Sequence, residues 1–139
     1  MQIKLFIIIL LFSPFVSGEE ICGVGKIKYI LKQKEVIKTV SMCENIKKFG
    51  EYIYSINCRA LDCRFVKDPY KKPISLKKYA RSVGSPGFKV CRELKGSPQI
   101  IQYQLNSKEW KQDARCIFGK SSFVSNHILM SIWKDYILY

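Results

Sequence analysis

Six cysteines constrain this 139-residue chain more than any other feature of its sequence. All six follow an N-terminal segment with the pattern of a secretory signal peptide. An even number of cysteines in an exported chain predicts a disulfide framework. Zinc binding is the competing interpretation, and it is disfavoured because there is no Cys-x-x-Cys and only one histidine. We therefore expect no metal, no cofactor, and disulfide bonds formed by Cys22, Cys43, Cys58, Cys63, Cys91 and Cys116.

Residues 1–18 predict the export signal. Lys4 gives a positive start, residues 5–12 form an apolar run, and small residues precede a cleavage point after Gly18. The apolar run has about eight residues, whereas a helix needs roughly twenty to span a bilayer. We therefore expect residues 19–139 to form one domain with one hydrophobic core, secreted or periplasmic.

The segment 23–43 alternates apolar and polar residues on either side of a polar break, which predicts a β-hairpin. If the turn centres on Lys32 and Gln33, counting outward along both strands brings Cys22 opposite Cys43. Facing strands hold such a pair at a distance that suits a disulfide, so we expect a Cys22–Cys43 bridge. A register slip of one residue would separate the two side chains.

A third strand is expected from about Glu51 to Cys58, because tyrosine and isoleucine are frequent there. Cys58 and Cys63 enclose only four residues. We favour a local bridge between these two cysteines. The alternative is that each of them crosses to a distant partner.

Two short helices are expected next. Ser75 is placed to cap a helix over 76–83, and Ser85 to cap a second helix over 86–95. Proline suits the first helical position of the second helix, and Gly96 is expected to end it.

The rest of the chain predicts two strands and a last helix. The strands are expected over 99–105 and 114–119, and the segment Gly-Lys-Ser-Ser is interpreted as the turn into the helix. From Asn126 onward, apolar residues recur at helical spacing, so this helix should pack on the sheet. The expected fold class is α+β: a small disulfide-stapled domain with an antiparallel sheet, short helices and a C-terminal helix.

The chain is strongly basic, with a formal charge of +13 that becomes +12 when Lys4 leaves with the signal. Nine basic residues and two acidic ones lie in 67–95. Such a run either forms a solvated face or binds a polyanion: an envelope polymer, a nucleic acid or an anionic lipid surface. The candidate anion-binding residues are Lys71, Lys72, Lys77, Lys78 and Arg81.

No catalytic motif is present. His127 lacks the companions of a two-histidine ribonuclease, and Ser121 or Ser122 lies in no Gly-x-Ser-x-Gly elbow. The acidic residues considered for glycoside hydrolysis all look exposed: Glu51, Asp62, Glu93 and Asp113. We therefore expect a non-enzymatic exported protein that binds an anionic partner. The alternative is a small basic secreted hydrolase, lysozyme-like or nuclease-like.

Residues 87–133, about a third of the chain, resemble the short exported bacterial haemolysin-type domain of unknown function. The positions that carry the resemblance are Cys91, Gly96, Cys116, Phe118, Gly119, Ser121 and Trp133. The resemblance implies an exported, disulfide-stapled module. It also implies a bridge between Cys91 and Cys116, in keeping with our interpretation of 114–126 as scaffold.

Overall fold

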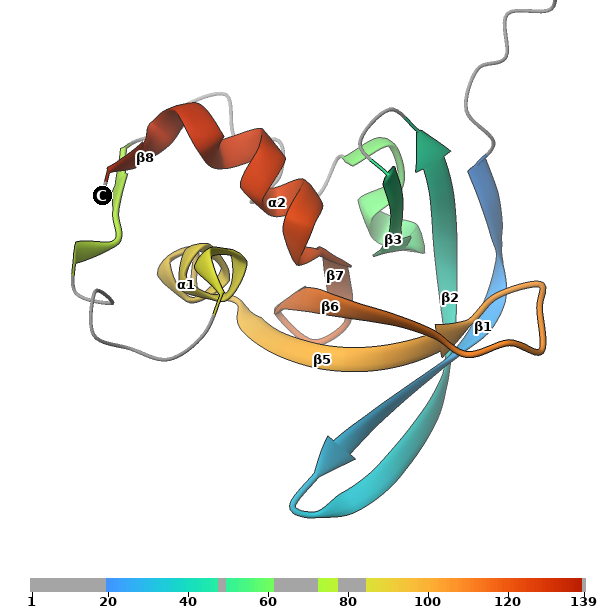
Figure 1. Cartoon of the computed structure of the whole chain (residues 1–139). Coiled ribbons are helices and arrows are strands. Elements are labelled where there is room, and N and C mark those ends of the chain that lie inside the picture. Colours follow the sequence, from blue (N-terminus) through green and yellow to red (C-terminus); the bar gives the residue numbers. More distant parts are fainter. Residues whose placement is uncertain (1–19, 48–49, 62–72, 78–84, 139) are drawn as a thin grey trace, which may run out of the picture.

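The structure is a computed structural model that describes residues 20–47, 50–61, 73–77 and 85–138, and all structural statements refer to these residues (Figure 1). The strands are β1 (Glu20–Leu31), β2 (Lys34–Lys47), β3 (Gly50–Ser55), β4 (Ile74–Ser75), β5 (Ser97–Gln104), β6 (Lys111–Phe118), β7 (Ser122–Ser125) and β8 (Ile137–Leu138). The α-helices are α1 (Pro86–Glu93) and α2 (Asn126–Trp133), and the 3-10 helices are η1 (Ile56–Leu61) and η3 (Lys134–Tyr136).

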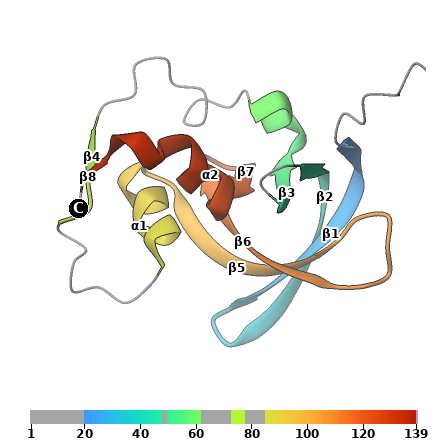
Figure 2. The same ribbon diagram turned by 45° about the horizontal axis from the view of Figure 1, so that its top comes forward.

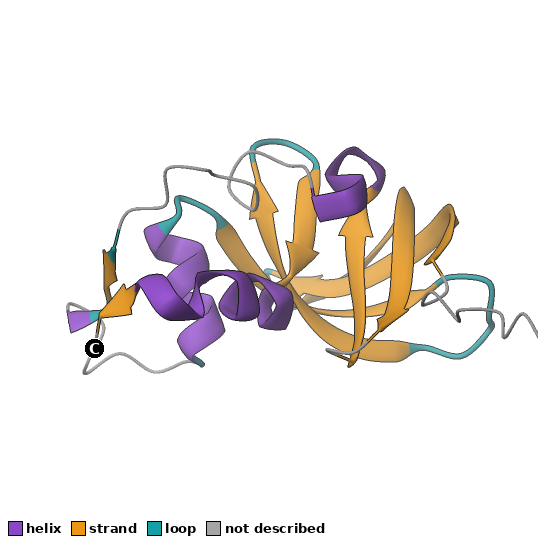
Figure 3. Ribbon diagram, turned by 90° about the horizontal axis from the view of Figure 1, so that it is seen from above, coloured by secondary structure: helices purple, strands orange, loops and turns teal. Residues whose placement is uncertain are grey.

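Six of these strands form a closed barrel in the order β1-β2-β3-β7-β6-β5. It consists of two antiparallel meanders, β1-β2-β3 and β5-β6-β7, joined where β1 pairs with β5 and β3 pairs with β7. Strands dominate the described residues, and the two α-helices lie together on one side of the barrel (Figure 3). The predicted α+β fold class is therefore wrong. The two joining ladders are long-range pairings, which local periodicity does not reveal.

Side chains alternate between the two faces of each barrel strand, so each strand contributes to two clusters. One face fills the barrel interior with Ile27, Met42, Ile53, Ile101, Tyr103 and Phe123. The opposite face of the strands packs under the helices. The cluster formed there includes Val90, Leu94, Phe118, Val124, Leu129 and Trp133. Figure 2 shows α1 and α2 side by side over this second cluster.

The β1–β2 hairpin has the predicted register. Its ladder runs from Glu20 opposite Asn45 to Leu31 opposite Lys34, and it places Cys22 opposite Cys43. The two cysteines form a disulfide with their Cα atoms 4.0 Å apart, which confirms the predicted bridge.

The second predicted bridge is also present, between Cys91 of α1 and Cys116 of β6. Ser85 caps α1 as expected. The helix ends because Lys95 adopts a left-handed φ of 67° and the Gly96 amide donates to the Cys91 carbonyl at 2.8 Å. Gly96 is required for a second reason: a Cβ there would lie 2.3 Å from the Cys116 Sγ atom.

Two local predictions need correction, and a third falls mostly outside the described residues. The third is the helix over 76–83, which stays a prediction; Ser75 belongs to β4, and its hydroxyl accepts a hydrogen bond from the Lys77 amide at 3.4 Å. The Gly-Lys-Ser-Ser segment turns into β7 and not directly into the last helix, because the chain first adds a barrel strand. The C-terminal helix is confirmed from Asn126, but it ends at Trp133.

The apolar side chains from α2 to the end of the described chain pack mostly as the helical spacing indicated. Ile128, Leu129, Trp133 and Ile137 are buried and Ile132 is half-buried, whereas Tyr136 is exposed. α2 packs against α1 as well as against β6 and β7, so the sheet is only part of its contact surface. Beyond it, β8 pairs in parallel with β4.

Two serine hydroxyls complete the seam between β3 and β7. The backbone ladder there consists of one residue pair, Tyr54 opposite Val124. On one side of this pair, the Ser125 hydroxyl oxygen accepts a hydrogen bond from the Ile53 amide at 2.9 Å. On the other side, the Ser55 hydroxyl oxygen accepts one from the Phe123 amide at 2.9 Å. These hydroxyl groups satisfy buried backbone donors that would otherwise lack a partner at the seam.

No helix within the described residues is both long enough and apolar enough to cross a membrane. The disulfides indicate an oxidising compartment.

We predict that Ser125→Ala lowers the free energy of unfolding by about 1–3 kcal/mol, since it leaves the buried Ile53 amide without an acceptor. Urea denaturation of the oxidised protein measures this change. Ser121→Ala is the matched control, because Ser121 is exposed in the turn before β7. Equal unfolding free energies for the two variants would mean that the hydroxyl does not hold the seam.

We also predict that Gly96→Ala destabilises the protein by about 1–3 kcal/mol, because the added methyl group displaces the neighbouring disulfide. In a background in which Cys91 and Cys116 are both alanine, the same change should cost clearly less. Thermal unfolding of the four proteins in this double-mutant cycle measures the coupling. An unchanged cost in the alanine background would show that the disulfide is not what requires glycine.

Candidate functional site

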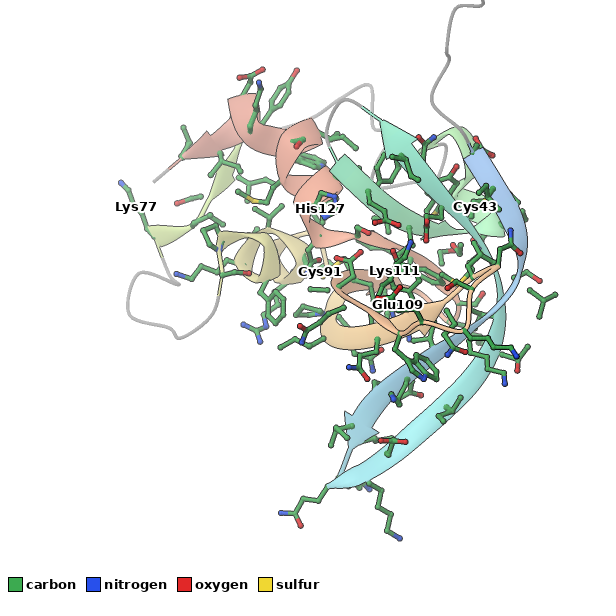
Figure 4. All side chains as sticks on the ribbon, turned by 45° about the vertical axis from the view of Figure 1, so that its right-hand side comes forward. Cys43, Lys77, Cys91, Glu109, Lys111 and His127 are labelled. Atoms are coloured by element: carbon green, nitrogen blue, oxygen red, sulfur yellow. A yellow bond between two sulfur atoms is a disulfide. The ribbon has the colours of Figure 1, made fainter. Side chains whose placement is uncertain are left out.

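A group of charged side chains lies where β7 ends. β7 stops at Ser125 and the chain turns into α2, whereas β3 and β6 extend farther in their ladders with β2 and β5. The space between β3 and β6 contains polar side chains from five elements. Figure 4 labels Lys111 of β6 and His127 of α2 in this region. The side chains are Glu44, Glu51, Lys111, Asp113, Ser125 and His127.

Lys111 crosses from β6 to two glutamates on the neighbouring meander. Its ammonium nitrogen lies 3.1 Å from Oε1 of Glu44 and also contacts Oε1 of Glu51. Glu44 is 5% exposed, because strand alternation turns it into the barrel on the same face as Met42. Glu51 and Lys111 are more exposed, at the rim of the same opening.

The two glutamates have unequal proton affinities. Burial, together with a hydrogen bond to Glu51, raises the pKa of the Glu44 carboxyl. The hydrogen bonds from Glu44 and Lys111 lower the pKa of the Glu51 carboxyl. A hydrogen bond to Glu51 also raises the pKa of the Lys111 ammonium. Glu44 therefore binds a proton before Glu51 does.

A carboxyl group with a raised pKa beside an ionised carboxyl group is the pattern of an acid–base pair in hydrolases. Here, however, both carboxyl groups contact the same ammonium group of Lys111. The lysine occupies the position that a substrate would need between the two acids. The arrangement is that of an ion-pair network closing the barrel wall.

The second part of the cluster joins Ser125, Asp113 and His127. The Ser125 hydroxyl lies 2.6 Å from Oδ2 of Asp113, and Nδ1 of His127 lies 3.9 Å from Oδ1 of the same carboxylate. The carboxylate thus lies between the serine and the histidine. In a nucleophilic triad the histidine must lie between them, so that it can take the proton of the serine. Ser125 is also completely buried.

The predicted exposure of the acidic residues is partly wrong. Glu51 is exposed as expected, but the Asp113 side chain is only 15% exposed because it packs beside Ser125. Glu93 is half-buried, and Asp62 lies outside the described residues. Glu44, the most buried acid of the cluster, was not among the candidates. The signal available in the sequence was strand alternation, which places Glu44 on the same strand face as Met42.

Every described cysteine is disulfide-bonded. Cys58 is among them, while its predicted partner Cys63 lies outside the described residues, so the local bridge stays a prediction. Glu20 lies close to Cys22 and Cys43 in a group that resembles a metal site. Because both sulfur atoms belong to a disulfide, they are not available as thiolate ligands.

The predicted anion-binding run is described at one position only. Lys77 is exposed just after β4, on the helical side of the molecule and far from the turn of the β1–β2 hairpin (Figure 4). Lys71, Lys72, Lys78 and Arg81 lie outside the described residues. Convergence of the five side chains on one patch therefore stays a prediction.

The described residues form a different basic surface, on the outer half of the β1–β2 hairpin. β1 pairs with β5 only over Lys26–Lys28, and β2 pairs with β3 only from Met42 onward. Residues 29–41 therefore form a two-stranded ribbon that projects from the barrel (Figure 1). We call residues 24–41 the basic hairpin. It contains one acidic residue, Glu35, and the lysines Lys26, Lys28, Lys32, Lys34 and Lys38.

We predict that Lys111→Met lowers the free energy of unfolding by about 1–3 kcal/mol at pH 7, because buried Glu44 loses its charged partner. Without the ammonium group, the paired glutamates hold protons more tightly in the folded protein than in the unfolded chain. Stability of the variant should therefore fall as the pH rises above the ordinary glutamate pKa.

The deficit should shrink as the pH falls toward about 4, because the Glu44 carboxyl, whose pKa is raised, then binds a proton and no longer needs the ammonium group. Thermal unfolding at pH 4 and pH 7 measures this loss of stability, and Lys108→Met is the control because Lys108 is exposed. A deficit independent of pH would contradict the ion-pair interpretation.

Comparison with known proteins assigns neither a family nor a function to this chain. No family model matches the chain, and neither a curated protein nor a solved structure matches it. The resemblance to the haemolysin-type domain therefore stays a prediction.

Proposed function

We propose that this chain is an exported, non-enzymatic binding protein, secreted or periplasmic, that contacts an anionic partner through the basic hairpin. The observation that carries the proposal is the projection of the lysine-rich ribbon beyond the barrel. The ribbon makes no ladder with β3 or β5, so its outer edges have no backbone partner within the described residues.

The charge of the basic hairpin supports this proposal. Lys26, Lys32, Lys34 and Lys38 are exposed, and Lys28 lies 4.2 Å from the centre of the Trp110 ring. Charges on one projecting element create a local positive potential that attracts polyanions and speeds their association. The net charge of +12 that the chain keeps after loss of Lys4 adds to the same attraction.

The alternative is a small basic hydrolase, lysozyme-like or nuclease-like. Glu44 and Glu51 are the closest approach to a catalytic acid pair among the described residues, and Lys111 bridges them. A retaining or inverting glycosidase needs its two carboxyl groups on opposite sides of a bound sugar. The bridging lysine favours the binding function over this alternative.

A salt titration with a short DNA duplex tests the proposal, since the duplex is a soluble polyanion with known phosphate spacing. Reversing Lys32, Lys34 and Lys38 to glutamate should weaken binding steeply. It should also reduce the slope of log affinity against log salt by about one unit for each lysine that contacts a phosphate. The matched control reverses three exposed lysines outside the ribbon: Lys108, Lys120 and Lys134.

Equal losses from the two triple variants would show that only net charge matters, and would overturn the proposal. A third variant reverses Lys77, Lys78 and Arg81, the run indicated by the sequence. A larger loss from that variant than from the hairpin variant would place the binding surface there. Unchanged thermal unfolding in all three variants is the check that the fold is intact.

A further inference from the structure

We propose that the anionic partner of the basic hairpin is a lipid bilayer surface, with aliphatic side chains of the ribbon entering the headgroup region. This inference rests on the proposed function and names the partner of the same surface. It is carried by the exposed aliphatic residues among the lysines.

Four large aliphatic side chains are exposed on and beside the ribbon. Ile30 is 67% exposed, Ile100 is 62% exposed, and Leu31 and Ile37 are each 53% exposed. Single exposed aliphatic residues are ordinary, but a group of them on one projecting element indicates an interaction surface.

The register brings three of these residues together. Ile30 faces Glu35 and Ile37 faces Lys28, so Ile30 and Ile37 are diagonal neighbours on one face of the ribbon. Ile30 and Ile100 line the same cavity of about 190 Å³, where β1 and β5 separate beyond their short ladder. Lys28 and Glu35 line this cavity as well, so the aliphatic group lies beside one cation and one carboxylate.

The turn of the hairpin departs from the most stable choice of residues. Lys32 and Gln33 both adopt left-handed φ values, of 49° and 64°. A two-residue turn of this kind is most stable with Asn-Gly, because those residues tolerate positive φ at little cost. The turn places the exposed Lys32 side chain at the tip of the hairpin.

The mixture of side chains favours a bilayer over a soluble polyanion. A nucleic acid or sulfated polymer would neutralise the lysines but leave Ile30, Leu31 and Ile37 in water. An anionic bilayer offers phosphate groups to the lysines and the start of the acyl region to the aliphatic side chains. Trp110, which lies under the Lys28 ammonium, is an aromatic residue of the type found at the level of the headgroups.

The free edges of the ribbon limit how deeply it enters. Within the part of the chain that the structure describes, backbone groups of 29–31 and 34–41 have no ladder partner on their outer sides. Unpaired backbone groups are not tolerated in the hydrocarbon core, so these edges must remain hydrated. The expected association is peripheral, reversible and sensitive to salt.

Sedimentation with two kinds of vesicle tests the inference: equal parts phosphatidylglycerol and phosphatidylcholine, or phosphatidylcholine alone. The oxidised mature protein should bind the anionic vesicles at least tenfold more tightly. The double variant Ile30→Ser and Ile37→Ser should weaken this binding about tenfold or more, because two exposed aliphatic side chains are lost. Its affinity for the DNA duplex should stay within about twofold, since all the lysines remain.

The matched control is Ile46→Ser with Leu138→Ser, two aliphatic residues that are 52% and 54% exposed outside the ribbon. This control should bind vesicles like the parent protein. Trp110 gives a second readout: brominated lipids should quench its fluorescence, whereas Trp133 is buried.

Each other outcome overturns one of the two proposals. Unchanged vesicle binding by the Ile30 and Ile37 double variant, or parent protein that binds DNA but not anionic vesicles, would overturn the lipid inference and leave a soluble anionic partner. Loss of both vesicle and DNA binding in that variant would show that the two side chains only support the ribbon, which also overturns it. Parent protein that binds neither probe, or binding to vesicles unaffected by reversal of Lys32, Lys34 and Lys38, would overturn the proposed function itself.

Discussion

The barrel depends on two hydroxyl groups at the seam between β3 and β7. One backbone pair joins these strands, and Ser55 and Ser125 accept the flanking amide hydrogen bonds on either side of it. Both hydrophobic clusters meet at this seam: Ile53 and Phe123 belong to the barrel interior, whereas Tyr54 and Val124 belong to the cluster under the helices. Opening the seam would therefore expose both clusters together, because alternate residues of the same two strands supply them.

The seam also determines where the charged residues lie. Beyond Ser125 no strand of the described residues separates β3 from β6, and Lys111 of β6 reaches the two glutamates across this opening. The Ser125 hydroxyl that accepts the Ile53 amide also contacts Asp113. Buried polar groups need partners, and here they find them in one another. The cluster thus has the residue types of an active site. Its geometry, however, is that of an ion-pair network that closes the barrel wall.

The opposite situation holds at the outer half of the β1–β2 hairpin. There the strands run beyond both of their barrel neighbours, and neither their edges nor Ile30 and Ile37 are covered by the described chain. The lysines on the same ribbon oppose contact with a second copy of so basic a chain. The proposed binding surface is therefore the part of the sheet that the barrel does not use.

Features that depend on neighbours in the sequence were predictable: the hairpin register with its Cys22–Cys43 bridge, the cap at Ser85 and the start of the last helix at Asn126. Strand alternation could also have placed Glu44 beside Met42. Closure of the barrel was not predictable, because it rests on β1–β5 and β3–β7 contacts between residues far apart in the sequence. Composition by itself determined a basic, disulfide-bonded chain. Only the tertiary structure decided which glutamates are paired with a lysine and which lysines project into solvent, since closing the barrel selects the face and the strand length that remain uncovered.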